Sequence, residues 1–235
     1  ASGNMGAETV RAVQAAEGLN LVGGIDAFDD PKQIIDSCNP DVVIDFTHPD
    51  VILQNITHYI GYGLHSVIGT TGLSAKDLET LDSLAKDKKV GVAVCPNFAI
   101  GAVLMMKAAA EISKYMDRVE VIEYHHDKKA DAPSGTAIKT IDVIIEANPN
   151  INTEKLDEKE LVECVRGGEY KGVQVHSVRL PGFIASQDVI FGGMGQRLKL
   201  THDTISRESF MPGVVLVVRK IQGKVGLLYG LENFL

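Results

Sequence analysis

The sequence has few cysteines, no long apolar run and no excess of basic residues. Its three cysteines, Cys38, Cys95 and Cys164, are too few and too scattered for a disulfide framework, and the odd number favours reduced thiols. The longest uncharged apolar run, residues 99–106, is far shorter than the ~18 residues of a membrane span. The net charge of −8 argues against nucleic acid or an anionic membrane as the main partner. Because no basic-then-apolar targeting segment opens the chain, we expect a soluble, cytoplasmic protein.

The first hundred residues or so alternate between helical and strand patterns. Apolar runs typical of buried strands cover residues 19–25, 41–46, 66–68 and 91–94, and helical periods cover residues 7–16, 51–62 and 74–87. Ser74 is placed as the N-cap of the last of these helices, with Asp77 as its capping-box partner. Strands that are apolar throughout and alternate with helices predict a doubly wound parallel sheet covered on both faces.

The second half of the chain has a different pattern. Helices are predicted over residues 100–115, 134–147 and 209–222, strands over 118–124, 173–178, 183–191 and 197–202, and a polar loop or short helix over 148–160. Turns at Pro181-Gly182 and Gly192-Gly193 separate the later strands, as in an antiparallel or mixed sheet. The sequence therefore predicts an α/β protein with a second, α+β domain.

The chain opens with two glycines, Gly3 and Gly6, directly before a helix. This spacing is the second half of a dinucleotide fingerprint, in which backbone amides at a helix N-terminus bind a pyrophosphate. The preceding strand and the first glycine are absent, since residue 1 already lies inside the motif. Taken alone, such a pair fits an ordinary loop equally well.

Asp26 supports the cofactor interpretation, because it ends the next apolar run about twenty residues later, where an acidic residue binds an adenosine ribose. Ala27 follows it rather than a basic residue, which favours NADH over NADPH. The alternative is a solvated carboxylate in a turn. Phe46-Thr47 and the Gly-Thr-Thr-Gly turn at residues 69–72 follow strand ends, where open parallel sheets bind ligands.

Residues 123–137 form the most informative segment. Two histidines and two lysines fall within five positions of an acidic protein, and Pro-Ser-Gly-Thr then opens a helix. Backbone amides at Gly135 and Thr136 would favour an anion. Lys128 or Lys129 would add charge-assisted hydrogen bonds of roughly 1.5–3 kcal/mol each. The segment therefore predicts a pocket for a small carboxylated substrate.

A metal site is a competing interpretation of His125 and His126. Adjacent residues of a strand point to opposite faces, so the two imidazoles would rarely reach one ion. No Glu or Cys lies at the usual ligand spacings either. We therefore predict no metal site, and a purely structural histidine pair remains a third alternative.

Residues 123–137 match every fixed position of the signature E-x-H-H-x-x-K-x-D-A-P-S-G-T-A, and the sequence thereby resembles the dihydrodipicolinate reductase family of bacterial and plant lysine biosynthesis. The similarity continues over nearly the whole chain. It includes the motifs at residues 3–6, 45–47, 69–72, 96–101, 176–179, 191–192 and 207–210.

The resemblance implies a Rossmann-type cofactor domain over residues 1–98 and 208–235, and an inserted substrate domain over 99–207 that also builds a homotetramer. It implies hydride transfer from NAD(P)H to the cyclic imine 4-hydroxy-tetrahydrodipicolinate, a dicarboxylate, giving tetrahydrodipicolinate. By position, His125 and Lys129 match catalytic proton-transfer residues, and which of them gives the proton stays open. His126, Gly135 and Thr136 match contacts to the substrate carboxylates. The expected cofactor contacts are Gly3, Asn4, Met5, Gly6, Asp26, Phe46, Gly69, Thr70, Thr71, Cys95, Pro96, Asn97 and Phe98.

Some points stay open at this level. After Asp26 the chain enters a helix through residues 27–31, where the family usually has a longer loop and a short strand, so the choice between NADH and NADPH is not determined. Glu123 either orients a histidine or lysine or is an ordinary sheet-surface residue. Two other functions are considered, a different two-domain amino- or imino-acid dehydrogenase and a dinucleotide-sensing regulator. Candidate acids beside an anion-binding helix start argue against the regulator.

Overall fold

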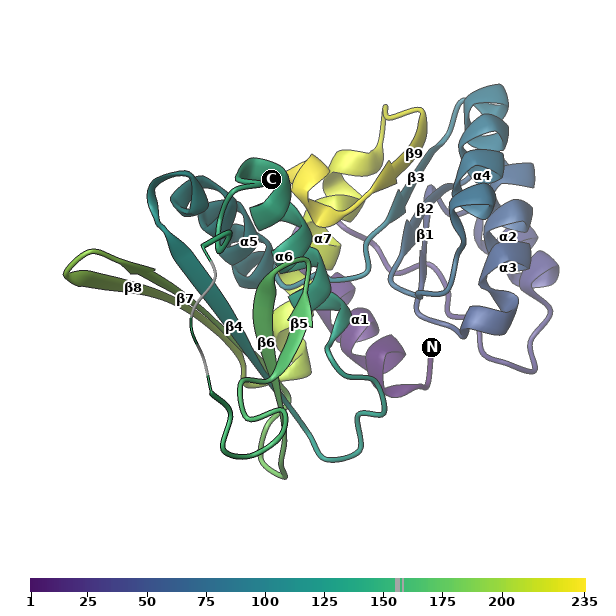
Figure 1. The fold of residues 1–235 in the computed structure, drawn as a ribbon. Coiled ribbons are helices and arrows are strands. Elements are labelled where there is room, and N and C mark those ends of the chain that lie inside the picture. The colour runs from purple at the N-terminus through teal and green to yellow at the C-terminus, as the bar shows by residue number, and fades with distance from the viewer. Residues whose placement is uncertain (155–156, 158) are drawn as a thin grey trace. The chain divides into compact units, whose positions relative to one another are not determined.

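The computed structural model describes residues 1–154, 157 and 159–235, which form two compact units (Figure 1). Unit 1 comprises Ala1–Ile100 and Arg207–Leu235, and unit 2 comprises Gly101–Ser206. The chain therefore leaves unit 1 once, builds unit 2, and returns to complete unit 1.

Unit 1 contains a four-stranded parallel sheet. Its strands lie in the order β1 (Val42–Asp45), β2 (His65–Ile68), β3 (Gly91–Val94) and β9 (Gly226–Tyr229). Helix α3 (Pro49–Gly61) connects β1 to β2, and α4 (Ala75–Lys88) connects β2 to β3. Every residue of β3 is buried, as expected of a parallel strand that is covered on both faces.

Helices cover this sheet in the way that a doubly wound fold requires. On one face, Ile56 of α3 and Leu81 of α4 pack with Val92 of β3 in a single apolar cluster. Helix α7 (Met211–Ile221) contacts β2 and β3, and α1 (Asn4–Ala15) contacts α7. The predicted capping box of α4 is confirmed, because Ser74 and Asp77 bond reciprocally at its first turn. The doubly wound α/β class predicted from the alternating pattern is thus observed.

The predicted buried strand over residues 19–25 is wrong. No strand is assigned there, and Leu21 and Val22 are 39% and 50% exposed. Among the described strands, β1 pairs only with β2 and ends the sheet, so the segment has no strand to pair with. An apolar run predicts burial, but a strand also needs a neighbour for its amides and carbonyls. The following helix, α2 (Pro31–Cys38), begins with Asp30 as its N-cap.

Unit 2 is built on a five-stranded mixed sheet. The strand order is β5 (Gly168–Tyr170), β6 (Val173–Arg179), β4 (Arg118–His125), β7 (Ala185–Gly193) and β8 (Gln196–Thr204). Central β4 is parallel to β6 and antiparallel to β7, so the predicted mixed sheet is confirmed. Helices α5 (Ile100–Ile112) and α6 (Gly135–Ala147) pack on one face, where Ala109 and Ile141 join Val121 in the core.

Several predicted boundaries need correction. The helix predicted over 100–115 ends as the 3₁₀ turn η1 (Ser113–Tyr115), and the one predicted from 209 is preceded by the 3₁₀ turn η2 (Arg207–Phe210). Pro212 explains the second case, because proline fits only the first turn of a helix. Strands β5 and β9 and the turn η3 (Leu231–Phe234) were not predicted. The described part of residues 148–160 contains no helix or strand, and residues 155, 156 and 158 lie outside it.

No helix among the described residues is long and apolar enough to cross a membrane.

Candidate functional site

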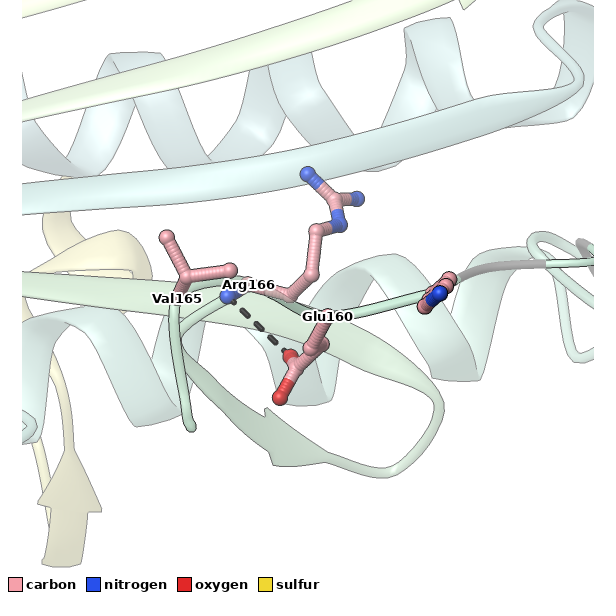
Figure 2. A pocket seen from close by; sticks show the side chains of 4 residues that line it. Glu160, Val165 and Arg166 are labelled. Carbon is pink, nitrogen blue, oxygen red and sulfur yellow. Dashed lines mark hydrogen bonds between the residues drawn. The ribbon is translucent and has the colours of Figure 1, made fainter. Parts of the chain in front are cut away.

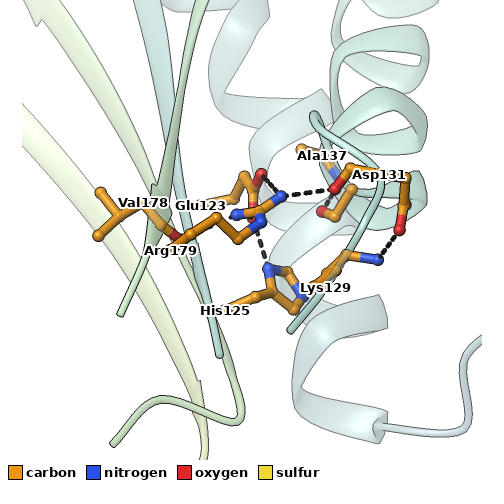
Figure 3. A network of polar contacts seen from close by, with 8 residues as sticks. Glu123, His125, Lys129, Asp131, Ala137, Val178 and Arg179 are labelled. Atoms are coloured by element: carbon orange, nitrogen blue, oxygen red, sulfur yellow. Dashed lines mark hydrogen bonds and ion pairs between the residues drawn. The ribbon is translucent and has the colours of Figure 1, made fainter. Parts of the chain in front are cut away.

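The segment predicted to bind substrate joins strand β4 to helix α6 of unit 2 (Figure 3). Glu123 and His125 lie near the end of β4, on the same face because strand side chains alternate. His126 is the first residue after the strand. The loop that follows ends at Ser134, whose hydroxyl accepts the Ala137 amide at 3.2 Å and caps α6.

Glu123 is fully buried and is the centre of a polar network. Its carboxylate contacts His125 Nδ1 at 2.5 Å and accepts hydrogen bonds from Arg179 Nη1 at 2.9 Å and Nη2 at 2.7 Å. Burial alone would raise the pKa of Glu123, but the hydrogen bonds from His125 and Arg179 outweigh it and lower the pKa to about 2. Glu123 is therefore ionised at neutral pH, and it is not an ordinary sheet-surface residue.

The ionised carboxylate determines the tautomer of His125. A carboxylate has no proton to give, so His125 Nδ1 carries the hydrogen of the 2.5 Å contact. The Nε2 atom is then the nitrogen of this ring that remains for proton exchange with a substrate. The imidazole is 14% exposed, so it is oriented by the protein and still accessible.

Lys129 lies in the same loop and is held by Asp131. Its Nζ is 2.6 Å from Asp131 Oδ1, and its side chain is 21% exposed. The carbonyl of Asp131 accepts a hydrogen bond from Arg179 Nη2 at 2.8 Å, which ties the loop to strand β6. The structure thus brings both predicted catalytic residues, His125 and Lys129, into one network of charged groups.

Gly135 and Thr136 are the first two residues of α6. The first turn of this helix carries no acidic side chain, so its partial positive charge is not neutralised from within the helix. Gly135 is exposed and has open space where a side chain would lie. This helix start suits a carboxylate, the chemistry predicted for Gly135 and Thr136.

No group of three or more His, Cys, Asp or Glu side chains that could hold a metal occurs in the described part of the chain. His125 is engaged by Glu123, and His126 is half-buried beyond the strand end.

In unit 1, the N-terminal segment that contains Gly3 and Gly6 lies against Asp26. Gly3 is the N-cap of α1, which places Asn4, Met5 and Gly6 in its first turn. Asp26 Oδ1 accepts the Ser2 amide at 2.7 Å and the Ser2 hydroxyl at 2.8 Å. A Cβ at Gly6 would lie 2.5 Å from the Ala1 carbonyl oxygen, so only glycine fits there. The fingerprint and the predicted ribose-binding carboxylate are therefore neighbours.

The remaining predicted cofactor contacts gather at the carboxyl edge of the parallel sheet. Phe46, Gly69 and Cys95 each follow the last residue of β1, β2 and β3. The Gly69 amide donates to the Asp45 carbonyl at 2.9 Å, and the Cys95 amide donates to the Ile68 carbonyl at 2.8 Å, which aligns the three strand ends.

The side chains along this edge have different surroundings. The rings of Phe46 and Phe98 pack with their centroids 5.7 Å apart. Asn97 Oδ1 accepts the Ala99 amide at 2.8 Å, while the neighbouring Pro96 is exposed. Burial raises the pKa of the Cys95 thiol to about 12, so the thiol is protonated at neutral pH.

Asp45 belongs to the motif at residues 45–47 but was not predicted as a site residue. It is 2% exposed and ends β1. Its carboxylate accepts hydrogen bonds from five groups: the Thr47 amide (2.8 Å), the Thr47 hydroxyl (2.7 Å), Asn55 Nδ2 (3.1 Å), the Tyr59 hydroxyl (2.9 Å) and the Thr70 hydroxyl (3.3 Å). One buried carboxylate thus holds the turns after β1 and β2 together. The sequence signal that could have indicated its role is an aspartate at the end of an apolar run.

Figure 2 shows a separate surface hollow lined by Lys159, Glu160, Val165 and Arg166. The Arg166 amide donates to Glu160 Oε1 at 3.3 Å. None of the predicted site residues lines this hollow.

Two family models together match nearly the whole chain. The model for the N-terminus of dihydrodipicolinate reductase matches residues 1–98, and the model for its C-terminus matches residues 101–235. The 4-hydroxy-tetrahydrodipicolinate reductase of Syntrophomonas wolfei is 45% identical over 100% of this chain and 96% of its own length. That of Listeria innocua is 43% identical over 99% of this chain and 96% of its own length.

A solved structure is also similar to this chain over its whole length. The dipicolinate-bound dihydrodipicolinate reductase of Paenisporosarcina sp. TG-14 has a TM-score of 0.89 and 40% sequence identity, covering 100% of this chain and 96% of that one. The amine dehydrogenase of Mycobacterium smegmatis, at 11% identity and a TM-score of 0.55, shares the fold alone. The matches over both units show that this chain belongs to the dihydrodipicolinate reductase family, a family of oxidoreductases.

Proposed function

We propose that this protein reduces 4-hydroxy-tetrahydrodipicolinate to tetrahydrodipicolinate with a nicotinamide dinucleotide, in the diaminopimelate route to lysine. The observation that carries the proposal is the segment from β4 to α6. It combines an oriented imidazole at His125, an ammonium at Lys129 and an anion-favouring helix start at Gly135. The full-length similarity to named reductases supports the same activity.

The chemistry of the substrate fits these groups. Hydride addition to a conjugated imine builds negative charge that a nearby acid must neutralise, and both His125 and Lys129 are suitable acids. His126, Gly135 and Thr136 are proposed to bind the substrate carboxylates. The start of α6, which has no acidic side chain in its first turn, offers a carboxylate a positive partial charge within an acidic protein.

The residues of unit 1 fit a dinucleotide. Gly3 leaves open space beside the backbone at the start of α1 for a pyrophosphate, and Asp26 lies next to this segment to accept ribose hydroxyls. The bound cofactor supplies the hydride. We assign the adenosine end to Gly3–Gly6 and Asp26, and the carboxyl edge of the sheet, residues 46, 69–71 and 95–98, to further cofactor contacts.

We propose that NADH is used at least as well as NADPH. Asp26 would repel a 2′-phosphate, and Ala27 offers no compensating charge. Arg11 in α1 and Lys32 in α2 are both paired with carboxylates of their own helices, Glu8 and Asp36. A strong preference for NADPH in steady-state assays would contradict this proposal.

We further propose a cytoplasmic homotetramer assembled through unit 2. The resemblance to the family supports it. So does the sheet of unit 2, because both of the described helices of this unit pack on the same face and leave the other for a neighbouring copy. Light scattering of the purified protein would test the oligomeric state.

The direct test is a coupled assay with the aldehyde–pyruvate condensation product as substrate, following NADH or NADPH absorbance. We expect oxidation of the cofactor that depends on the substrate. No oxidation with either cofactor would contradict the proposed function. Parallel reactions with amino acids and NAD⁺ would then test the alternative dehydrogenase.

A further inference from the structure

Arg179 bonds the hydrogen-bonding partners of both candidate proton-transfer residues (Figure 3). Its guanidinium donates to the Glu123 carboxylate and to the Asp131 carbonyl. Glu123 bonds His125 Nδ1 at 2.5 Å, and the Asp131 side chain bonds Lys129 Nζ at 2.6 Å. A single side chain therefore connects His125 on the strand to Lys129 in the loop.

We propose that Arg179 is a positioning residue for proton transfer. Through Glu123 it sets the orientation of the His125 ring, and through Asp131 it holds the loop that carries Lys129. The inference rests on the proposed function, in which one of these two groups protonates the reduced substrate. Arg179 itself acts only through its neighbours.

The strand register explains why residue 179 can do this. Strands β4 and β6 are parallel, with His125 opposite Arg179 and Glu123 opposite Ser177. Side chains of paired residues lie on the same face of a sheet, so Arg179 reaches back to Glu123 from the neighbouring strand. The end of β6 also lies next to the loop, which places the Asp131 carbonyl 2.8 Å from Nη2.

The contacts at position 179 require a guanidinium group. Its planar fork meets both oxygens of one carboxylate, and further N–H groups remain for the Val178 and Asp131 carbonyls. A lysine supplies a compact ammonium that cannot reproduce the planar two-point contact. The geometry thus distinguishes arginine from a cation in general.

If the Arg179–Glu123 ion pair only stabilised the fold, its loss would have different effects. Glu123 is fully buried and the Arg179 side chain is 18% exposed, so loss of the guanidinium leaves a buried charge poorly compensated. If stability were its only role, the variant would lose folded protein and bind NADH less well in proportion. A positioning role instead lowers kcat in the protein that is folded.

The kinetic test compares Arg179→Ala and Arg179→Lys with the wild type. We expect Arg179→Ala to lower kcat about tenfold or more, with the KM for NADH changed less than about twofold. Guanidinium at non-denaturing concentrations should restore part of the loss, and methylammonium should not. If Arg179→Ala does not fold, Arg179→Lys keeps a cation beside Glu123 and should still show the kcat loss.

Arg118→Ala is the matched control, because Arg118 lies at the other end of β4 and bonds Glu154 instead. Its kcat should stay within about twofold of the wild type. Wild-type kcat in Arg179→Ala, or a loss that follows the unfolded fraction and ignores guanidinium, would overturn the proposal.

A second readout does not depend on activity. In proton NMR, the wild type should show a low-field, exchange-protected signal from His125 Nδ1–H. Glu123→Gln should abolish it, Arg179→Ala should broaden or shift it, and Arg118→Ala should leave it unchanged. An inactive wild type with this pattern would refute the proposed function while leaving the positioning contact established. An unchanged signal in Arg179→Ala would refute the role of Arg179.

Discussion

The phenyl ring of Phe46 lies directly on the α-carbon of Gly69. A Cβ at position 69 would overlap two ring atoms and lie 2.8 Å from Cζ. The same ring packs against Phe98, with centroids 5.7 Å apart. Three strand ends of unit 1 are therefore packed through one aromatic side chain, at the edge where we propose that the cofactor binds.

We expect Gly69→Ala to displace the Phe46 ring and weaken NADH binding about tenfold, with a loss of unfolding free energy of about 1–3 kcal/mol from overpacking. Fluorescence titration with NADH and urea unfolding would measure the two effects. Gly61→Ala is the control, since nothing lies within 4 Å of a Cβ there. Equal NADH affinity in both variants would contradict a cofactor role for this edge.

We expect Asp45→Asn to destabilise unit 1 by at least about 1–3 kcal/mol, because an amide cannot accept all the hydrogen bonds that the buried carboxylate accepts. The turns after β1 and β2 would loosen, so NADH affinity should fall as well. Urea unfolding and calorimetric titration with NADH test this, with Asp87→Asn, an exposed position on α4, as the control. A stable variant with normal affinity would show that the five contacts to Asp45 are unimportant.

We expect Lys129→Ala to reduce kcat about a hundredfold or more, since it removes a candidate acid, and to leave NADH affinity nearly intact. Steady-state kinetics with a separate NADH titration would measure both. Lys139→Ala, an exposed lysine on α6, should behave like the wild type. Unchanged turnover in Lys129→Ala would remove this residue from the mechanism.

The stability of unit 2 should depend on acid pH through Glu123. Its folded-state pKa is about 2 against an ordinary 4.5, a lowered value, so its contribution is fully present above pH 4.5 and is lost as the pH falls towards 2. The shift corresponds to about 3 kcal/mol at neutral pH.

Urea unfolding at a series of pH values tests this linkage. Glu123→Gln should be less stable than the wild type at pH 7, and the difference should shrink as the pH falls below 4.5. Glu146→Gln, an exposed position on α6, is the control and should show a small difference at every pH. A Glu123→Gln difference that stays constant with pH would contradict the assigned ionisation.

Local sequence patterns were sufficient to predict much of the fold. Short apolar runs predicted β1, β2 and β3, and helical periods predicted the helices between them. The Ser74–Asp77 capping box was readable because its contacts span three residues. The segment 19–25 failed for the opposite reason, since its apolar character could not reveal that it has no strand partner. Strand β5 was missed because its three residues carry too little periodicity.

The sequence by itself determined the family, the α/β class and the segment 123–137, because these depend on residue type and near spacing. Only the tertiary structure decided that Glu123 is buried and bonded by Arg179, 56 residues away in the chain. It also decided that Asp45 collects donors from Thr47 to Thr70. Such contacts form because strand pairing and chain crossovers bring distant residues together. No periodic pattern in the sequence indicates which distant residues will meet.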